Sequence, residues 1–113
     1  MHEMSLVEGV LHLIEDAASV QNFRCVKKVW LEVGELAGVE VDAMRFCFDA
    51  VMHGSIAEGA TLEIVKTPGQ AWCMKCSQAV PLRALLDACP LCGSHQLQVT
   101  GGNALRVKEL EVE

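Results

Sequence analysis

Four of the six cysteines in this chain form two Cys-x-x-Cys pairs, one at Cys73 and Cys76 and the other at Cys89 and Cys92, with twelve residues between the pairs. A two-residue spacer lets a turn bring both sulfur atoms of a pair to one ion. The twelve-residue link is a little shorter than is usual in such quartets, but it is long enough for a hairpin or a loop. Because four thiolates satisfy the tetrahedral preference of zinc, the pattern predicts a closed, structural zinc site.

Other uses of paired cysteines fit the chain less well, with one exception. Disulfides require an oxidising compartment, and the first residues lack the basic and apolar regions of a secretory signal. A thioredoxin-like redox site needs one Cys-x-x-Cys at a strand-to-helix junction, whereas two pairs that bracket one segment indicate a shared metal. An iron–sulfur cluster also uses four cysteines, and spacing alone does not separate it from zinc. Zinc is the favoured assignment, and the cluster is its alternative.

The opening triplet Met1-His2-Glu3 contains a second candidate ligand. A lone histidine near a chain start is usually only solvated. The terminal amine, the deprotonated amide of His2 and its imidazole can nevertheless chelate one ion in fused rings, and three nitrogens in a plane suit nickel(II) or copper(II). The fourth corner stays open, which favours transfer of the ion to a receiving site. His2 is therefore a candidate ligand for a metal that is carried, and Glu3 adds negative charge beside it.

The remaining cysteines and histidines have simpler explanations. Cys25 and Cys47 fall where a strand and a helix face would be buried, and free cysteine commonly behaves as a small core hydrophobe. His12 and His53 have no second ligand near them by spacing, so contact with solvent or with helix-end carbonyls explains them. His95 is the one histidine close to the cysteine pairs, and its metal role is left open.

Composition limits the classes of function. Of 113 residues, 51% are hydrophobic, which is enough for the core of one domain or of one domain with a small module. The formal net charge of −6 opposes binding to nucleic-acid phosphates or to an anionic membrane surface. No apolar run approaches the roughly 18 residues of a transmembrane helix. These features, with the missing secretory signal, predict a soluble, cytoplasmic protein.

The spacing of apolar residues predicts the elements that must position these groups. The predicted elements are helices over residues 4–20 and 40–52 and strands over residues 25–36, 61–65 and 104–112. A strand, a helix and a strand in succession favour a crossover, and hence a mixed sheet. The expected fold class is α+β, with two helices packed on a small mixed sheet.

Residues 70–99 differ from the rest of the chain. They hold both cysteine pairs, two of the three prolines and few residues able to build a core. We expect metal to replace a core there, so the segment should be unfolded without zinc. The predicted division is an α/β domain over residues 1–69 and 100–113, which contains His2 as a candidate ligand for nickel or copper, with an inserted zinc-ribbon-like module over residues 70–99.

With these residues identified, the sequence resembles the HypA/HybF family of hydrogenase nickel-insertion accessory proteins. The resemblance covers nearly the whole chain. It rests on Met1-His2-Glu3, the cysteine quartet, and the segments 29–34, 46–48, 53–55 and 57–59 between them. The triplet alone would mean little, but it is specific in combination with a quartet in this order and at this chain length.

The resemblance implies roles for particular residues and partners. It implies that His2 is the nickel ligand and that the four cysteines of the quartet hold a structural zinc ion. Members of the family carry nickel to the large subunit of nickel–iron hydrogenases together with a partner GTPase, and in some organisms they also serve urease. Dimers occur in the family, so a monomer or a homodimer is expected here.

We therefore expect a non-enzymatic nickel metallochaperone, with Ni²⁺ as cargo and Zn²⁺ as a structural ion. Four cysteines leave no zinc position for a catalytic water, and no phosphate-binding glycine-rich loop is present. Nucleotide hydrolysis would then belong to the partner. The alternative is a zinc-ribbon adaptor that binds proteins and has no nickel role. Neither nucleic acid nor a membrane is expected as a partner.

Overall fold

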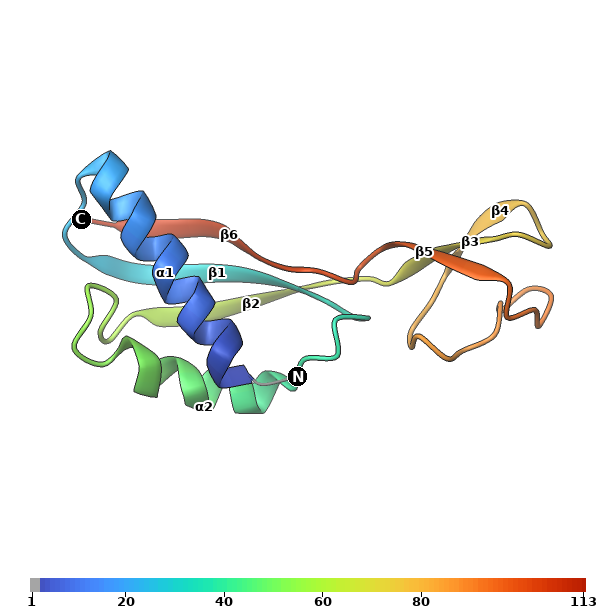
Figure 1. Ribbon diagram of the computed structural model, residues 1–113, viewed down its shortest axis with the longest axis horizontal. Coiled ribbons are helices and arrows are strands. Elements are labelled where there is room, and N and C mark those ends of the chain that lie inside the picture. Colours follow the sequence, from blue (N-terminus) through green and yellow to red (C-terminus); the bar gives the residue numbers. More distant parts are fainter. Residues whose placement is uncertain (1–2) are drawn as a thin grey trace. The chain divides into compact units, whose positions relative to one another are not determined.

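The computed structural model describes residues 3–113, which form two helices and six strands (Figure 1). Their bounds are α1 Glu3–Gln21, β1 Val26–Gly34, α2 Val41–Met52, β2 Thr61–Thr67, β3 Gln70–Cys73, β4 Gln78–Pro81, β5 Leu97–Gly101 and β6 Leu105–Val112. The described residues divide into two compact units. The first contains residues up to 31, 39–64 and 106–113, and the second contains 32–38 and 65–105. Neither helix of the described chain is long and apolar enough to cross a membrane.

In the first unit, α1 packs against α2. Each helix turns one apolar stripe inward, because residues three and four apart lie on the same face. The most buried members, each no more than 1% exposed, are Val7, Val10 and Ile14 of α1 and Met44, Phe48 and Met52 of α2. Both predicted helices are confirmed to within one residue at each end, which is the usual uncertainty of helix limits.

Strand β1 alternates between a buried and a partly exposed face, as its sequence predicts. Its buried face contains Val29, Leu31 and Val33, and the residues between them are partly exposed. On the partly exposed face, Lys28 Nζ lies 4.8 Å from the centroid of the Trp30 ring. The strand therefore contributes one face to the core and leaves the other half covered.

The first sheet has the strand order β2-β1-β6 and is mixed. Strands β1 and β6 are antiparallel, because Cys25 before β1 and Glu113 after β6 exchange backbone hydrogen bonds of 3.3 and 2.9 Å. At the other end of β1, the Glu35 amide donates to the carbonyl of Thr67, the last residue of β2, at 2.9 Å. Strands β1 and β2 thus end together, a parallel pairing that the crossover through α2 permits. The predicted α+β fold with a mixed sheet is confirmed.

The second sheet lies in the second unit and has the order β4-β3-β5, with β3 antiparallel to both neighbours. Cys73, the last residue of β3, is placed opposite Gln78 of β4 and Leu97 of β5. A small apolar cluster lies against this sheet. Its buried members are Leu36, Ala71, Cys73, Val80, Leu82 and Cys89. The segment therefore has a modest core of its own, to which Leu36 comes from outside residues 70–99.

Three glycines allow backbone segments of the second unit to approach closely. A Cβ atom added at Gly34 would overlap the carbonyl of Gly102, and one added at Gly69 would overlap the carbonyl of Leu82. Gly102 has a positive φ of 74°, which glycine adopts without strain. The hydrogen bond from the Leu36 amide to the Gly102 carbonyl, 2.7 Å long, depends on this approach.

Candidate metal centre

The four cysteines of the two Cys-x-x-Cys pairs come together in the second unit. Cys73 ends β3 and Cys76 lies in the turn to β4, whereas Cys89 and Cys92 lie in the connection between β4 and β5. All four Sγ atoms lie within 4.8 Å of one another. Within residues 3–113, no other group of three or more histidine, cysteine or acidic side chains gathers in this way. The long connection folds back so that the second pair faces the first.

The sulfur spacing fits a tetrahedral ion. Cys73 Sγ and Cys92 Sγ are 3.7 Å apart, and Cys76 Sγ and Cys89 Sγ are 3.9 Å apart. Zinc–sulfur bonds of about 2.3 Å in a tetrahedron place the sulfurs about 3.8 Å from one another. All six cysteines of the chain are free thiols. The donor set and its spacing therefore suit structural zinc.

Both cysteine pairs are built on the same kind of turn. The Ser77 amide donates to the Cys73 carbonyl at 2.8 Å, and the Gly93 amide donates to the Cys89 carbonyl at 2.9 Å. Ser77 and Gly93 each have a positive φ, of 52° and 75°. In the first turn the Cys76 amide also donates to Cys73 Sγ at 3.3 Å. Backbone donors aimed at sulfur stabilise the thiolate form that binds metal.

The four thiols differ in burial, and the pKa values of Cys76 and Cys89 are shifted in opposite directions. Cys73 is fully buried and Cys89 is 3% exposed, whereas Cys92 is exposed. Burial of Cys89 opposes its ionisation, but hydrogen bonds from the backbones of Cys92 and Leu91 and from the side chains of Cys92 and Cys73 together outweigh burial and lower the pKa of Cys89 to about 7. The hydrogen-bonded side chain of Cys92 is the main cause that raises the pKa of Cys76 to about 12. A bound cation would favour the thiolate at all four positions.

The other candidate ligands do not join this site. His95 is exposed and lies outside the four-cysteine group. Cys25 and Cys47 are partly buried, in keeping with packing roles. His53, the residue after α2, is exposed, and its Nδ1 atom lies 2.8 Å from Glu58 Oε1. His53 thus forms a local contact at the end of the helix.

The nickel candidate His2, with Met1, lies outside the described residues. Glu3, the next residue, begins α1, and its Oε2 atom accepts a hydrogen bond of 3.2 Å from the Glu40 amide. Glu40 immediately precedes α2. The contact therefore joins the starts of the two helices and brings a second acidic residue to the start of α1. No spacing rule links residues 3 and 40, so the sequence contained no signal for it.

The chain matches known proteins over its whole length. Residues 1–112 match the family model described as "Hydrogenase/urease nickel incorporation, metallochaperone, hypA". The chain is 61% identical to the hydrogenase maturation factor HypA of Azotobacter chroococcum mcd 1, and 62% identical to the protein of that name from Albidiferax ferrireducens. Each match covers 100% of both chains.

Two solved structures of HypA proteins also match the chain. The solution structure of the Ni metallochaperone HypA from Helicobacter pylori matches with a TM-score of 0.74 and 26% identity, over 99% of this chain and 97% of that one. A second solution structure of a HypA protein matches with a TM-score of 0.72 and 27% identity, over 100% and 97% of the two chains. The family assignment does not favour a zinc-ribbon adaptor without a nickel role. The chain therefore belongs to the HypA family of nickel metallochaperones for hydrogenase maturation, and its four-cysteine site fits structural zinc.

Proposed function

We propose that this chain carries Ni²⁺ on His2, through the terminal amine, the backbone amide and the imidazole, while its four paired cysteines hold a structural Zn²⁺. Family membership over residues 1–112 is the observation that carries the nickel half of the proposal. The zinc half is supported by sulfur–sulfur distances of 3.7 and 3.9 Å. Each metal then has ligands of the chemistry it prefers: nitrogen for nickel and thiolate for zinc.

The zinc site would be structural and the nickel site would transfer its ion, because their coordination differs. Four thiolates complete a tetrahedral zinc site and leave no position at which an acceptor could enter. Three nitrogens in a plane leave one corner of the nickel site open, so an incoming ligand can bind before the old ligands leave. Glu3 and Glu40 add negative charge at the start of α1, which favours a divalent cation there.

We assign nickel binding to the unit that contains α1 and α2, and zinc binding to the unit that contains β3, β4 and β5. As functional domains, we retain residues 1–69 with 100–113 for nickel and residues 70–99 for zinc. The compact second unit is larger than residues 70–99, because it also takes in residues 32–38, 65–69 and 100–105. The segment 32–38 is the one distant in sequence. Leu36 in that segment packs beside Cys73 and Cys89 and would support the zinc ligands.

The proposed partners are the large subunit of a nickel–iron hydrogenase, which would receive the ion, and a hydrogenase-maturation GTPase. The chain itself would catalyse no reaction, since a four-thiolate zinc ion has no place for a water nucleophile. We propose that the protein acts in the cytoplasm, where its six free thiols would stay reduced. A net charge of −6 argues against nucleic acid and membranes as partners.

A nickel titration of the untagged protein tests the assignment of His2. We expect His2→Ala, or a few residues added before Met1, to weaken nickel binding by at least about 100-fold, because even indirect changes at metal sites cost about 10- to 100-fold. His12→Ala is the matched control, since His12 is an exposed histidine of α1. Nickel affinity of the unaltered protein should fall as the pH drops below about 8, where the terminal amine gains a proton, and should fall more steeply below about 6.5, where the imidazole also gains one.

Calorimetry gives the nickel affinity and stoichiometry, and elemental analysis gives the zinc content of each variant. One zinc per chain should remain in all of them. Wild-type nickel affinity and stoichiometry in both amino-terminal variants would remove His2 from the site.

A further inference from the structure

Strand β6 is an open edge of the first sheet. Its hydrogen-bonding partner is β1, and no strand among residues 3–113 pairs with its other side (Figure 1). An edge strand presents a row of unpaired N–H and C=O groups, so it can accept a strand from another chain. β6 has eight residues, with neither proline nor glycine among them. It is the longest edge strand of the two sheets.

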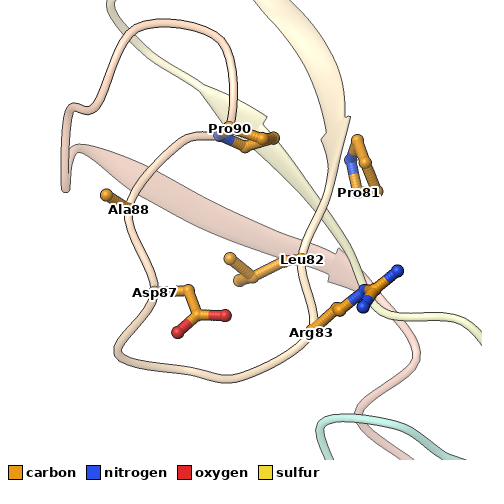
Figure 2. A pocket seen from close by; sticks show the side chains of 6 residues that line it. All are labelled: Pro81, Leu82, Arg83, Asp87, Ala88 and Pro90. Carbon is orange, nitrogen blue, oxygen red and sulfur yellow. The ribbon is translucent and has the colours of Figure 1, made fainter.

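The other edge strands of the two sheets are less suited to pairing with another chain. In β2, the carbonyl of Leu62 already accepts a hydrogen bond of 3.0 Å from Arg45 Nη1. β4 has only four residues and ends at Pro81, which lines a cavity and has no amide hydrogen to donate (Figure 2). β5 has five residues and ends at Gly101. Because β6 is longer than all three, it offers the most backbone groups to a new strand.

The apolar side chains of β6 are incompletely covered. No residue of this strand is buried, whereas β1 beside it has a buried face. Leu105, Val107 and Leu110 are each only partly buried. A further strand at this edge would remove some of their apolar area from water, which favours association.

The charged residues of β6 are ordered by sign along the strand. Its amino-terminal half has Arg106 and Lys108, and its carboxyl-terminal half has Glu109 and Glu111. All four residues are exposed. Lys108 and Glu109 make no ion pair with any residue between 3 and 113. With two cations and two carboxylates, the strand adds nothing to the net charge of −6.

This order of charges is complementary to itself when two copies of the strand run in opposite directions. The basic half of each copy then lies beside the acidic half of the other, with Lys108 near Glu109 of the second copy. Long side chains on neighbouring strands reach both the opposite and the diagonal position. Parallel pairing would instead place like charges side by side. A strand of a single sign would meet both signs on β6, so the order favours a second copy of this chain.

We propose that two copies of this chain associate through β6, with the two β6 strands antiparallel and the two three-stranded sheets joined across a two-fold axis. Backbone hydrogen bonds supply the attraction, and the order of charges fixes the direction of the strands. Because the contact is one strand wide and each copy has a net charge of −6, the association is weak and reversible. It requires neither nickel nor His2.

Sedimentation of the zinc-loaded protein without nickel measures the association. Between about 10 µM and 1 mM, the mean mass should rise from that of one chain toward that of two. In ¹⁵N-labelled protein, the amide signals of residues 105–112 should shift over the same range. Those of β2, at the opposite edge of the sheet, should not.

Single charge reversals at the centre of β6 test the order of charges. Lys108→Glu should weaken the association by about tenfold or more, because residue 108 then meets Glu109 of the second copy. Glu109→Lys should have the same effect, since it brings two lysines together. An equimolar mixture of the two variants should associate about as well as the unaltered protein, because each strand supplies the charge that the other lacks. Lys66→Glu is the matched control, since Lys66 is an exposed residue of β2, and it should leave the association unchanged.

Four results would overturn the proposal. They are a constant mass up to about 1 mM, a Lys108→Glu variant that associates as well as Lys66→Glu, a mixture that associates no better than its two components, and amide shifts confined to residues outside β6. Circular dichroism and the amide spectrum confirm that each variant is folded. Nickel affinity should be the same in Lys108→Glu as in the unaltered protein, which separates this test from that of His2.

Discussion

Among the paired cysteines, the degree of burial separates a structural role from a purely ligating one. Cys73 and Cys89 belong to the apolar cluster of the second unit, so replacing either would damage packing as well as the proposed zinc site. Cys92 is exposed, and its Sγ atom lies 3.7 Å from that of Cys73. Cys92 is therefore the position at which loss of a ligand can be measured with least damage to the core.

We predict that Cys92→Ser binds zinc far more weakly than the unaltered protein, because a neutral hydroxyl replaces one of four thiolates. Competition with a chromophoric chelator measures the affinity, and elemental analysis measures the zinc content after purification. Cys25→Ser is the control, since Cys25 lies outside the four-cysteine group, and it should retain one zinc per chain. Stoichiometric zinc of unchanged affinity in Cys92→Ser would show that three cysteines suffice.

At the scale of elements, two glycines with opposite surroundings show where glycine is required. Gly9 is exposed within α1, and an added Cβ would meet nothing within 4 Å. Gly34 ends β1, and an added Cβ would overlap the backbone of Gly102. The first glycine only weakens a helix, whereas the second allows two segments of the second unit to meet.

Gly9→Ala should therefore raise the free energy of unfolding by about 1 kcal/mol, the difference between glycine and alanine inside a helix. Gly34→Ala should lower it by about 1–3 kcal/mol, as overpacking does. Urea unfolding of the zinc-loaded protein, followed by circular dichroism, measures both changes. A stabilising Gly34→Ala substitution would contradict the close contact between Gly34 and Gly102.

At the scale of the whole molecule, the two compact units differ in what stabilises them. The first has an apolar core built from both helices and their neighbouring strands. The second has short strands and a small cluster in which two of the six buried members are cysteines of the candidate zinc site. Metal removal should therefore affect the two units unequally.

We predict that a strong chelator unfolds β3, β4 and β5 while α1 and α2 remain folded. Hydrogen exchange should lose protection at Ala71, Val80 and Leu97, and should keep it at Val10 and Phe48. Adding zinc back should restore the protection. Simultaneous loss of protection in both units would mean that they fold as one, and full protection without metal would mean that the apolar cluster alone is sufficient.

Periodicity predicted the elements that have long apolar repeats, and it missed the short ones. The stripe through Val7, Val10 and Ile14 identifies α1 because a helix repeats every 3.6 residues. Strands β3, β4 and β5 have only four or five residues each, too few for a repeat to emerge. They form because Cys73 pairs with Gln78 on one side and Leu97 on the other, a long-range condition that local sequence does not express.

By itself, the sequence determined the family and the chemistry of the four-cysteine site, because two-residue spacers bring paired thiols together whatever the rest of the chain does. Only the tertiary structure decided which residues surround those thiols. Leu36 joins their apolar cluster, Glu3 accepts a hydrogen bond from the Glu40 amide, and Arg83 stands beside a hollow. These contacts join residues that lie far apart in the chain, and such contacts arise from the path of the folded backbone, which no local spacing encodes.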